Sequence, residues 1–207
     1  MQTLKSNSMK KLLVTLFLST AMVVMASAQF TKFGGGLGFS TGYLFHEMDY
    51  DYNKSGNFNI FTKGIYELSL PFHISPSITF FVPHVYKDAP FAGEEYKATV
   101  STLMIDINGH YVFNSLDKME FYGLAGLDIL LAWKREVYNM SGTKTKYKES
   151  DNALGLNLGL GSYIKLTEQM DLSVEAKYII SKYSQFMVNA GILLNLQWLS
   201  KNENPGI

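Results

Sequence analysis

The stretch from Asn152 to Leu166 alternates apolar side chains with small or polar ones along its whole length. Its apolar parity consists of Leu154, Leu156, Leu158, Leu160, Ile164 and Leu166, and its other parity of Gly155, Asn157, Gly159, Gly161, Tyr163 and Lys165. Only a strand places these two sets on opposite faces, because successive side chains of a strand point to opposite sides. The run exceeds the usual soluble strand of about 5 to 6 residues and suits a bilayer-crossing strand, which needs roughly 9 to 11.

Seven further segments repeat this alternation, so the sequence predicts eight strands in all. The seven are, approximately, Phe30–Phe45, Ile60–Ile74, Ser77–Tyr86, Thr99–Phe113, Phe121–Lys134, Met170–Ile180 and Phe186–Leu199. The third strand in chain order, Ser77–Tyr86, is the least regular. Pro83 cannot donate a ladder hydrogen bond, so we expect a bulge or weak pairing there.

The expected connections alternate between short and long. Short turns are predicted at Ser75-Pro76, Asn114–Lys118 and Thr167–Gln169, and long polar loops at His46–Asn59, Lys87–Lys97 and Arg135–Asp151. The remaining connection, Ser181–Gln185, is short. Transmembrane barrels have short periplasmic turns and longer extracellular loops. Placing the N-terminus in the periplasm makes every long connection extracellular.

Alternation alone also fits a secreted soluble barrel or sandwich with its apolar face turned inward. Three features favour the membrane alternative. The apolar parity carries no charge from the fourth strand through the eighth, the polar parity is crowded with glycine, and aromatic residues fall near strand ends, as interfacial girdles do. These aromatic residues are Tyr43, Phe45, Phe121, Trp133, Phe186 and Trp198. The predicted fold is an all-β, eight-stranded antiparallel up-and-down transmembrane β-barrel.

Residues 1–28 have the three parts of a secretory signal peptide. Lys5, Lys10 and Lys11 form a positive region, Leu12–Met25 is mainly apolar, and Ala26-Ser27-Ala28 offers small residues for cleavage. The apolar run of about 14 residues is shorter than the roughly 20 that a spanning helix needs. We therefore expect cleavage before Gln29, a barrel over residues 29–199 and a polar tail over 200–207.

Charge and cysteine content narrow the possible functions. Removing residues 1–28 takes away three lysines and no acids, which changes 18 basic and 18 acidic residues into 15 and 18. This slightly acidic balance argues against general nucleic-acid binding. With no cysteine, the chain has neither a disulfide framework nor a lipid-anchoring cysteine.

The chain resembles the small eight-stranded outer-membrane β-barrel family, a porin-like group of Gram-negative bacteria that includes the Bacteroidota. The resemblance lies in the signal peptide, the glycine-rich run Phe33-Gly34-Gly35-Gly36-Leu37-Gly38, the eight alternating strands and the loop asymmetry. It implies an outer-membrane location and no single activity. It also implies an aromatic residue near the C-terminus that the barrel assembly machinery recognises; Trp198 is the candidate, although Leu199 and the polar tail follow it.

The polar parity places ten charged side chains in the predicted lumen: Lys32, Lys63, Glu67, Asp106, Asp128, Lys134, Lys165, Asp171, Glu175 and Lys177. We expect them to pair, because an unpaired buried charge costs several kcal/mol. An eight-stranded barrel is just wide enough for its side chains to fill it, whereas porins use 16 or more strands. The sequence thus favours a filled lumen, and a narrow channel for ions or small solutes is the alternative.

An enzyme and a metal site are two further hypotheses for the polar residues. His73 has Ser69 and Glu67 on its face of the strand, and His46 stands near the outer rim, but no nucleophile signature surrounds them. A lipid-modifying enzyme is therefore the second alternative, and no catalytic residue or cofactor is predicted. Residues 51–56 resemble half of a calcium loop, but Thr62 stands where a bidentate glutamate should close it, so no metal site is predicted.

The loop 135–151 contains the main candidates for surface contacts. Lipopolysaccharide phosphates could bind to Arg135, Lys144, Lys146 and Lys148. The alternative is a solvated loop without a binding role, since Glu136 and Glu149 lie in the same segment. Loop tyrosines could serve an extracellular glycan or protein ligand: Tyr50, Tyr52, Tyr96, Tyr138 and Tyr147. The sequence favours a structural or surface-interaction role through the extracellular loops.

Overall fold

The computed structural model describes residues 30–42, 57–88, 94–140 and 143–196. It contains eight strands, which are β1 (Lys32–Ser40), β2 (Asn57–Ser69), β3 (Phe72–Asp88), β4 (Glu94–Leu116), β5 (Met119–Met140), β6 (Thr143–Lys165), β7 (Met170–Ser181) and β8 (Gln185–Asn195). The predictions for residues 1–28, His46, Tyr43, Phe45, Tyr50, residues 51–56, Trp198 and the tail 200–207 lie outside the described residues. None of the described helices is long and apolar enough to cross a membrane.

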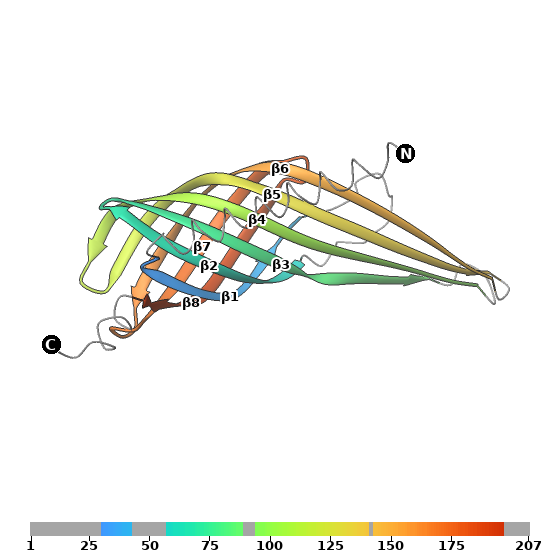
Figure 1. The fold of residues 1–207 in the computed structure, drawn as a ribbon, viewed down its shortest axis with the longest axis horizontal. Coiled ribbons are helices and arrows are strands. Elements are labelled where there is room, and N and C mark those ends of the chain that lie inside the picture. The colour runs from blue at the N-terminus through green and yellow to red at the C-terminus, as the bar shows by residue number, and fades with distance from the viewer. Residues whose placement is uncertain (1–29, 43–56, 89–93, 141–142, 197–207) are drawn as a thin grey trace, which may run out of the picture.

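Each strand pairs antiparallel with its neighbour in sequence, and β8 pairs with β1 to close the barrel. Lys32 of β1 lies opposite Ile65 of β2 on one side and Asn195 of β8 on the other. The amide of Leu196 donates to the carbonyl of Thr31 at 2.9 Å, which secures the two described ends of the barrel against each other. The predicted eight-stranded up-and-down barrel is confirmed (Figure 1).

The apolar parity faces outward, as the alternation predicts. In β6, Leu154, Leu156, Leu158 and Leu160 are exposed, whereas Ala153 and Asn157 are buried. The same division runs through β8, where Val188 and Ile192 are exposed and Met187 and Leu193 are buried. A barrel that exposes leucine on its outside and buries polar groups inside is inverted relative to a soluble protein, which identifies the outer belt as a lipid-facing surface.

The predicted turn at Ser75-Pro76 is wrong. β2 and β3 join at Leu70-Pro71, a cis peptide bond, and Ser75 and Pro76 lie within β3, opposite Asn108 and Ile107 of β4. Pro76 has no partner in the β2 register, which is the place that a residue without an N–H tolerates best. The two prolines offered two possible turns, and alternation alone could not choose between them.

Other local expectations agree with the structure. The register of β3 and β4 shifts between Phe81 and His84, which confirms the irregularity predicted at Pro83. The tight connections at 117–118 and 166–169 lie where short turns were expected, and β7 joins β8 through residues 182–184. The short turns between β2 and β3, β4 and β5, and β6 and β7 lie at one end of the barrel, hereafter the short-turn end (Figure 1).

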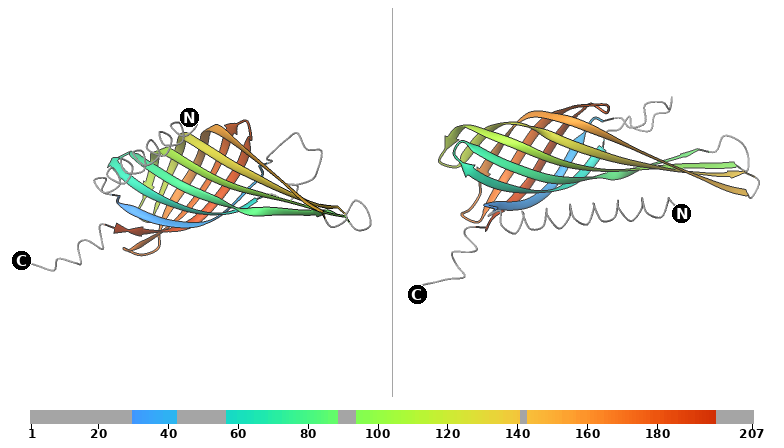
Figure 2. Two further views of the ribbon diagram at one scale, coloured as in Figure 1. Left: turned by 45° about the vertical axis from the view of Figure 1, so that its right-hand side comes forward. Right: turned by 45° about the horizontal axis from the view of Figure 1, so that its top comes forward.

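The predicted loops Lys87–Lys97 and Arg135–Asp151 are mostly strand. β3, β4, β5 and β6 continue past the opposite end of the barrel as a four-stranded sheet, here called the extension: residues 82–88, 94–101, 133–140 and 143–151 (Figures 1 and 2). Its pairing is regular, with Arg135 opposite both Thr99 and Lys148. Outside a bilayer both faces of a sheet can be polar, so these residues keep their strand pairing without the apolar alternation that identifies membrane strands.

Candidate functional sites: the lumen network and the two-faced extension

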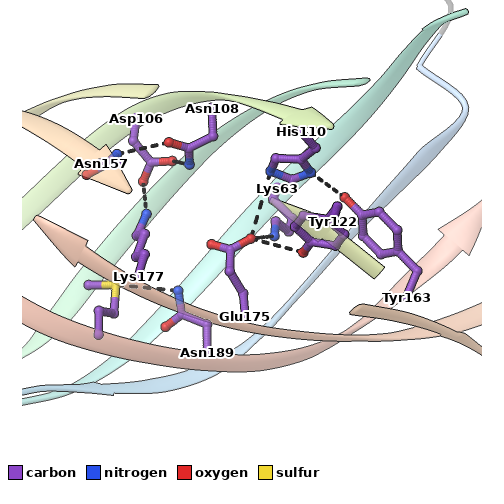
Figure 3. A network of polar contacts seen from close by, with 11 residues as sticks. Lys63, Asp106, Asn108, His110, Tyr122, Asn157, Tyr163, Glu175, Lys177 and Asn189 are labelled. Atoms are coloured by element: carbon purple, nitrogen blue, oxygen red, sulfur yellow. Dashed lines mark hydrogen bonds and ion pairs between the residues drawn. The ribbon is translucent and has the colours of Figure 1, made fainter. Parts of the chain in front are cut away.

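Glu175 of β7 is the centre of a buried polar network in the lumen (Figure 3). Its Oε2 accepts a hydrogen bond from Lys63 Nζ at 2.8 Å and another from Tyr122 Oη at 3.2 Å. His110 Nε2 lies 3.9 Å from the same oxygen, and its Nδ1 shares a 2.6 Å hydrogen bond with Tyr163 Oη. His110 also stacks on Tyr122 with ring centroids 4.3 Å apart. Four strands are thereby joined through one carboxylate.

A second buried cluster lies beside the first. Lys177 Nζ is 3.1 Å from Asp106 Oδ2, and both side chains are almost completely buried. Asn108 donates to Asp106 Oδ1 at 2.6 Å and accepts from Asn157 at 3.0 Å. This chain of donors and acceptors runs through β7, β4 and β6 (Figure 3), so the ion pair is enclosed by further hydrogen bonds, as a buried pair requires.

The other lumen candidates lie nearer the two ends. Lys32 is 2.9 Å from Asp171 and 3.6 Å from Glu67, close to the short-turn end. Lys165 is half-exposed at the rim of that end and pairs with Glu168 at 2.8 Å, so it does not join the buried clusters.

Lys134 lies at the opposite end, where the barrel meets the extension. Its Nζ is 2.6 Å from Glu149 and 3.8 Å from Glu136.

Asp128 differs from the other buried acids. It lies directly opposite Asp106 in the β4–β5 register and is 2% exposed, yet neither carboxylate oxygen has a hydrogen-bond partner among the described residues. Gly155 makes room for it, because a Cβ at that position would collide with the Asp128 carboxylate.

Apolar side chains enclose the charged clusters on both sides along the barrel axis. Toward the short-turn end, Tyr122 and Tyr163 belong to a cluster completed by Ile65, Val112, Leu124 and Leu193. Toward the extension lies a second cluster of Phe81, Met104, Ile179 and Met187, and a third of Leu130, Ala132, Ala153 and Tyr183. Along β4, His110, Asn108 and Asp106 fall between Val112 of the first cluster and Met104 of the second. The lumen is therefore packed with alternating apolar and ionic layers.

The geometry around the histidines does not assemble a nucleophile. His73 is buried opposite Glu67, but its Nδ1 has no hydrogen-bond partner among the described residues, and Ser69 is exposed and pairs with Phe72. Within the described part of the chain there is also no group of three or more histidine, cysteine or acidic side chains placed to hold a metal ion.

The face of the extension that continues the lipid-facing surface is strongly basic. Alternate residues place six cations on this basic face: Lys87, Lys97, Arg135, Lys144, Lys146 and Lys148. Glu95 is the one acid among the described side chains of this face. At its foot, next to the barrel, a groove of about 530 Å³ is lined by Thr99, Ser101, Trp133, Lys134, Arg135, Lys148, Glu149 and Ser150.

The face that continues the lumen has the opposite character and is here called the tyrosine face. Tyr86, Tyr96, Tyr138 and Tyr147 come from four adjacent strands, and successive ring centroids lie 6.2, 4.6 and 5.8 Å apart. Carboxylates interleave with the rings: Tyr96 Oη donates to Glu136 at 2.6 Å, and Tyr86 Oη donates to Asp88 at 3.4 Å.

Asp151 lies at the end of the tyrosine face, where the extension joins the barrel. It accepts hydrogen bonds from Lys182 Nζ, at 2.5 Å, and from Tyr183 Oη. These bonds, Lys182 first and Tyr183 second, lower the pKa of Asp151 from its ordinary 3.8 to about 2. Asp151 therefore stays ionised to a lower pH than an ordinary aspartate does.

Sequence reasoning missed two features of these sites. His110, Tyr122 and Tyr163 share the lumen parity with the predicted charges, so the same periodicity could have indicated their contact with Glu175. The separate basic and tyrosine faces of the extension could not be predicted, because the composition of residues 135–151 indicates a loop. In a loop, Glu136 and Glu149 would neutralise the basic residues. In the sheet, these acids lie on the tyrosine face.

Comparison with known proteins shows which family has this architecture. The family model for the outer membrane protein beta-barrel domain matches residues 12–198. The chain belongs to this family. It is thus an outer-membrane protein, with its short turns in the periplasm and its extension outside the cell. No curated protein matches the sequence significantly.

Several solved structures are similar at low sequence identity. The attachment invasion locus protein Ail of Yersinia pestis, solved with the heparin analogue sucrose octasulfate, is 13% identical, with 78% of this chain and 96% of that chain covered and a TM-score of 0.48. Neisserial surface protein A is 14% identical over 79% of this chain and 96% of its own, with a TM-score of 0.46. A major outer membrane protein of Thermus thermophilus is 13% identical over 79% of this chain and 98% of its own, with a TM-score of 0.48.

Proposed function

We propose that this outer-membrane barrel is a surface-interaction protein whose extension binds the phosphate groups of lipopolysaccharide through its basic face. The observation that carries the proposal is the sorting of charge on the extension. Lys87, Lys97, Arg135, Lys144, Lys146 and Lys148 share one face, and that face continues the lipid-facing belt of the barrel.

The position of the basic face fits a phosphorylated outer leaflet. Trp133 lies opposite Ser150 near the end of the lipid-facing belt, and Arg135 and Lys148 form the next outward-facing pair. With a strand rise of about 3.3 Å and a tilt of roughly 40°, this pair lies roughly 5 Å beyond Trp133, and Lys144 roughly 15 Å beyond Ser150. The cations thus extend from the bilayer interface through the depth that the lipid head group and inner sugars occupy.

Charge attraction supplies the binding energy. A basic side chain near an anionic membrane surface contributes about 1 kcal/mol, and salt weakens the attraction. Because Glu136 and Glu149 pair with Lys134 on the tyrosine face, they leave the charge of Arg135 and Lys148 uncompensated. The groove beside Trp133 offers room for a phosphorylated sugar, and its lining holds three cations, Lys134, Arg135 and Lys148, against one acid, Glu149.

The test compares wild type with the triple variant Arg135→Gln, Lys146→Gln, Lys148→Gln, both refolded free of lipopolysaccharide. Binding to vesicles that contain lipopolysaccharide is measured against vesicles of phosphatidylcholine and against dephosphorylated lipopolysaccharide. We expect the variant to bind phosphorylated lipopolysaccharide at least about tenfold more weakly, with a smaller dependence on salt. Lys118→Gln, in a periplasmic turn, is the matched control. Equal affinity of the triple variant and wild type would refute the proposal.

Two other functions have less support. A narrow channel would have to pass the apolar layers around Val112 and Met104 and the ion pairs between them. A lipid-modifying enzyme would need a nucleophile beside His73, but Ser69 is exposed and lies opposite Phe72, and His73 lies opposite Glu67.

We also propose that export removes residues 1–28 before the barrel assembly machinery inserts the chain. The support is the signal-like order of basic, apolar and small residues up to Ala28. Mass spectrometry of protein isolated from outer membranes should give an N-terminus at Gln29. Retention of Met1 or Met9 on the membrane-inserted protein would contradict this assignment.

A further inference from the structure

The tyrosine face of the extension has the chemistry of a recognition surface that the proposed lipopolysaccharide contact does not use. Its four rings form a continuous row across β3, β4, β5 and β6, and the outermost, Tyr147, is 56% exposed. Cross-strand aromatic pairs stabilise a sheet, which explains neighbouring pairs of rings. Sheet stability alone does not require carboxylates to be placed among the rings.

The charge of this face is opposite to that of the basic face. Its described acids are Asp88, Glu136, Glu149 and Asp151, and Lys134 is its one described cation within the extension. The Glu149 side chain remains 55% exposed although it pairs with Lys134. An excess of carboxylates repels phosphorylated and sulfated ligands, so this face cannot serve the same class of ligand as the basic face.

Rings and carboxylates together favour a cation. Lysine or arginine within about 6 Å of the centroid of a tyrosine ring is attracted by the negative face of the ring, and a carboxylate beside the ring adds a charge-assisted hydrogen bond. In an extended peptide, side chains on one face repeat every two residues, or about 6.6 Å. This repeat is close to the 6.2 Å between Tyr86 and Tyr96 and the 5.8 Å between Tyr138 and Tyr147, and it is longer than the 4.6 Å between Tyr96 and Tyr138.

We propose that the tyrosine face binds an extended polypeptide segment rich in arginine and lysine. Alternate cationic side chains lie over Tyr96, Tyr138 and Tyr147 and are held by the half-exposed carboxylate of Glu149, while Glu136, which is 9% exposed, accepts from Tyr96 and fixes its ring. The interaction is independent of the lipopolysaccharide contact, because the two ligands take opposite faces of one sheet. Its free energy comes from several weak charge-assisted contacts, so binding is weakened strongly by salt.

The experiment uses full-length mature protein, refolded without lipopolysaccharide in zwitterionic micelles, and a fluorescent octa-arginine peptide. Anisotropy should show saturable binding that weakens at least about tenfold between about 50 and 300 mM salt, as expected for a contact of several charges. An octa-glutamine peptide, which carries no charge, should not bind. Heat-modifiable mobility on a gel verifies that every variant is folded.

Two pairs of variants separate the ring and carboxylate contributions. Tyr138→Leu with Tyr147→Leu, and Glu136→Gln with Glu149→Gln, should each weaken octa-arginine binding at least about fivefold. Tyr178→Leu, a tyrosine on the lipid-facing side of β7, and Glu95→Gln, the acid of the basic face, are the matched controls and should bind as wild type does.

The outcomes distinguish this inference from the proposed function. Loss of peptide binding in the tyrosine-face variants, with lipopolysaccharide binding retained, supports it. Unchanged peptide binding in both pairs overturns it. So does preferential binding of an uncharged oligosaccharide such as maltoheptaose, because the face would then recognise sugar and not cationic peptide.

Discussion

At the scale of single residues, Glu175 contacts more polar side chains than any other described charge of the buried lumen network. It accepts from Lys63 and Tyr122, and the Tyr122 ring in turn supports His110. Gly161 lies against this arrangement, since a Cβ there would collide with the Tyr122 ring. One carboxylate thus links β2, β4, β5 and β7, and one missing side chain on β6 leaves room for the Tyr122 ring beside it.

Removing Glu175 alone should be costly. Glu175→Leu leaves the Lys63 ammonium buried without its partner, and breaking a buried pair from one side costs about 3 to 5 kcal/mol. The double variant Glu175→Leu, Lys63→Met should recover most of this loss, because both charges are gone. Urea unfolding in lipid vesicles measures the free energies. Lys165→Gln, which breaks the half-exposed pair with Glu168, should cost less than about 1 kcal/mol.

The two opposed aspartates of β4 and β5 should respond differently to the same change. Asp106→Asn removes the charge that faces Lys177, so we expect clear destabilisation. Asp128→Asn removes a charge whose oxygens have no hydrogen-bond partner among the described residues, so it should be neutral or stabilising. Parallel urea titrations of the two variants decide this. A larger loss for Asp128→Asn than for Asp106→Asn would show that Asp128 is the better-compensated acid.

At the scale of elements, Asp151, Lys182 and Tyr183 tie the foot of the extension to the β7–β8 turn. Because the folded pKa of Asp151 is depressed to about 2, its contribution to stability is fully present above the ordinary value of 3.8 and is lost as pH falls from about 4 toward 2. NMR titration of the Asp151 carboxyl carbon should show this. Lys182→Gln should raise the Asp151 pKa toward 3.8, whereas Lys118→Gln should leave it unchanged.

The elements show how far sequence reasoning reached. Alternation identified all eight strands and their inward and outward faces, because the boundary between lipid and packed lumen imposes a period of two. It failed where that boundary ends: Arg135–Asp151 has water on both sides, so its strands have no apolar stripe. It also failed at Pro71 and Pro76, where the choice of turn depends on which proline can lie within β3 without a partner on its β2 side.

The lumen contacts, too, could be predicted only in part from the sequence. The parity of Lys63, Asp106, Glu175 and Lys177 predicted that they would point inward, but parity carries no information about which strands face each other across a barrel. The Lys63–Glu175 and Lys177–Asp106 pairs join residues far apart in sequence. Their assignment needed the closed ring of strands.

At the scale of the whole molecule, the layered lumen predicts electrical silence. Ions would have to pass two apolar layers and separate buried ion pairs, so we expect no discrete conductance steps from purified protein in planar bilayers. A positive control with a porin of about 16 strands checks the bilayers. Reproducible steps that disappear in heat-unfolded samples would overturn the filled-lumen interpretation.

The sorted charges of the extension also give it a transverse electric dipole, with its positive side continuous with the lipid belt and its negative side above the barrel mouth. In the field of an anionic outer leaflet, such a sheet experiences a torque that leans its positive side toward the membrane. Its inclination, and therefore the height that its tip reaches above the cell, should change with the ionic strength of the surroundings. The same strands that span the bilayer would then make the reach of the protein respond to salt.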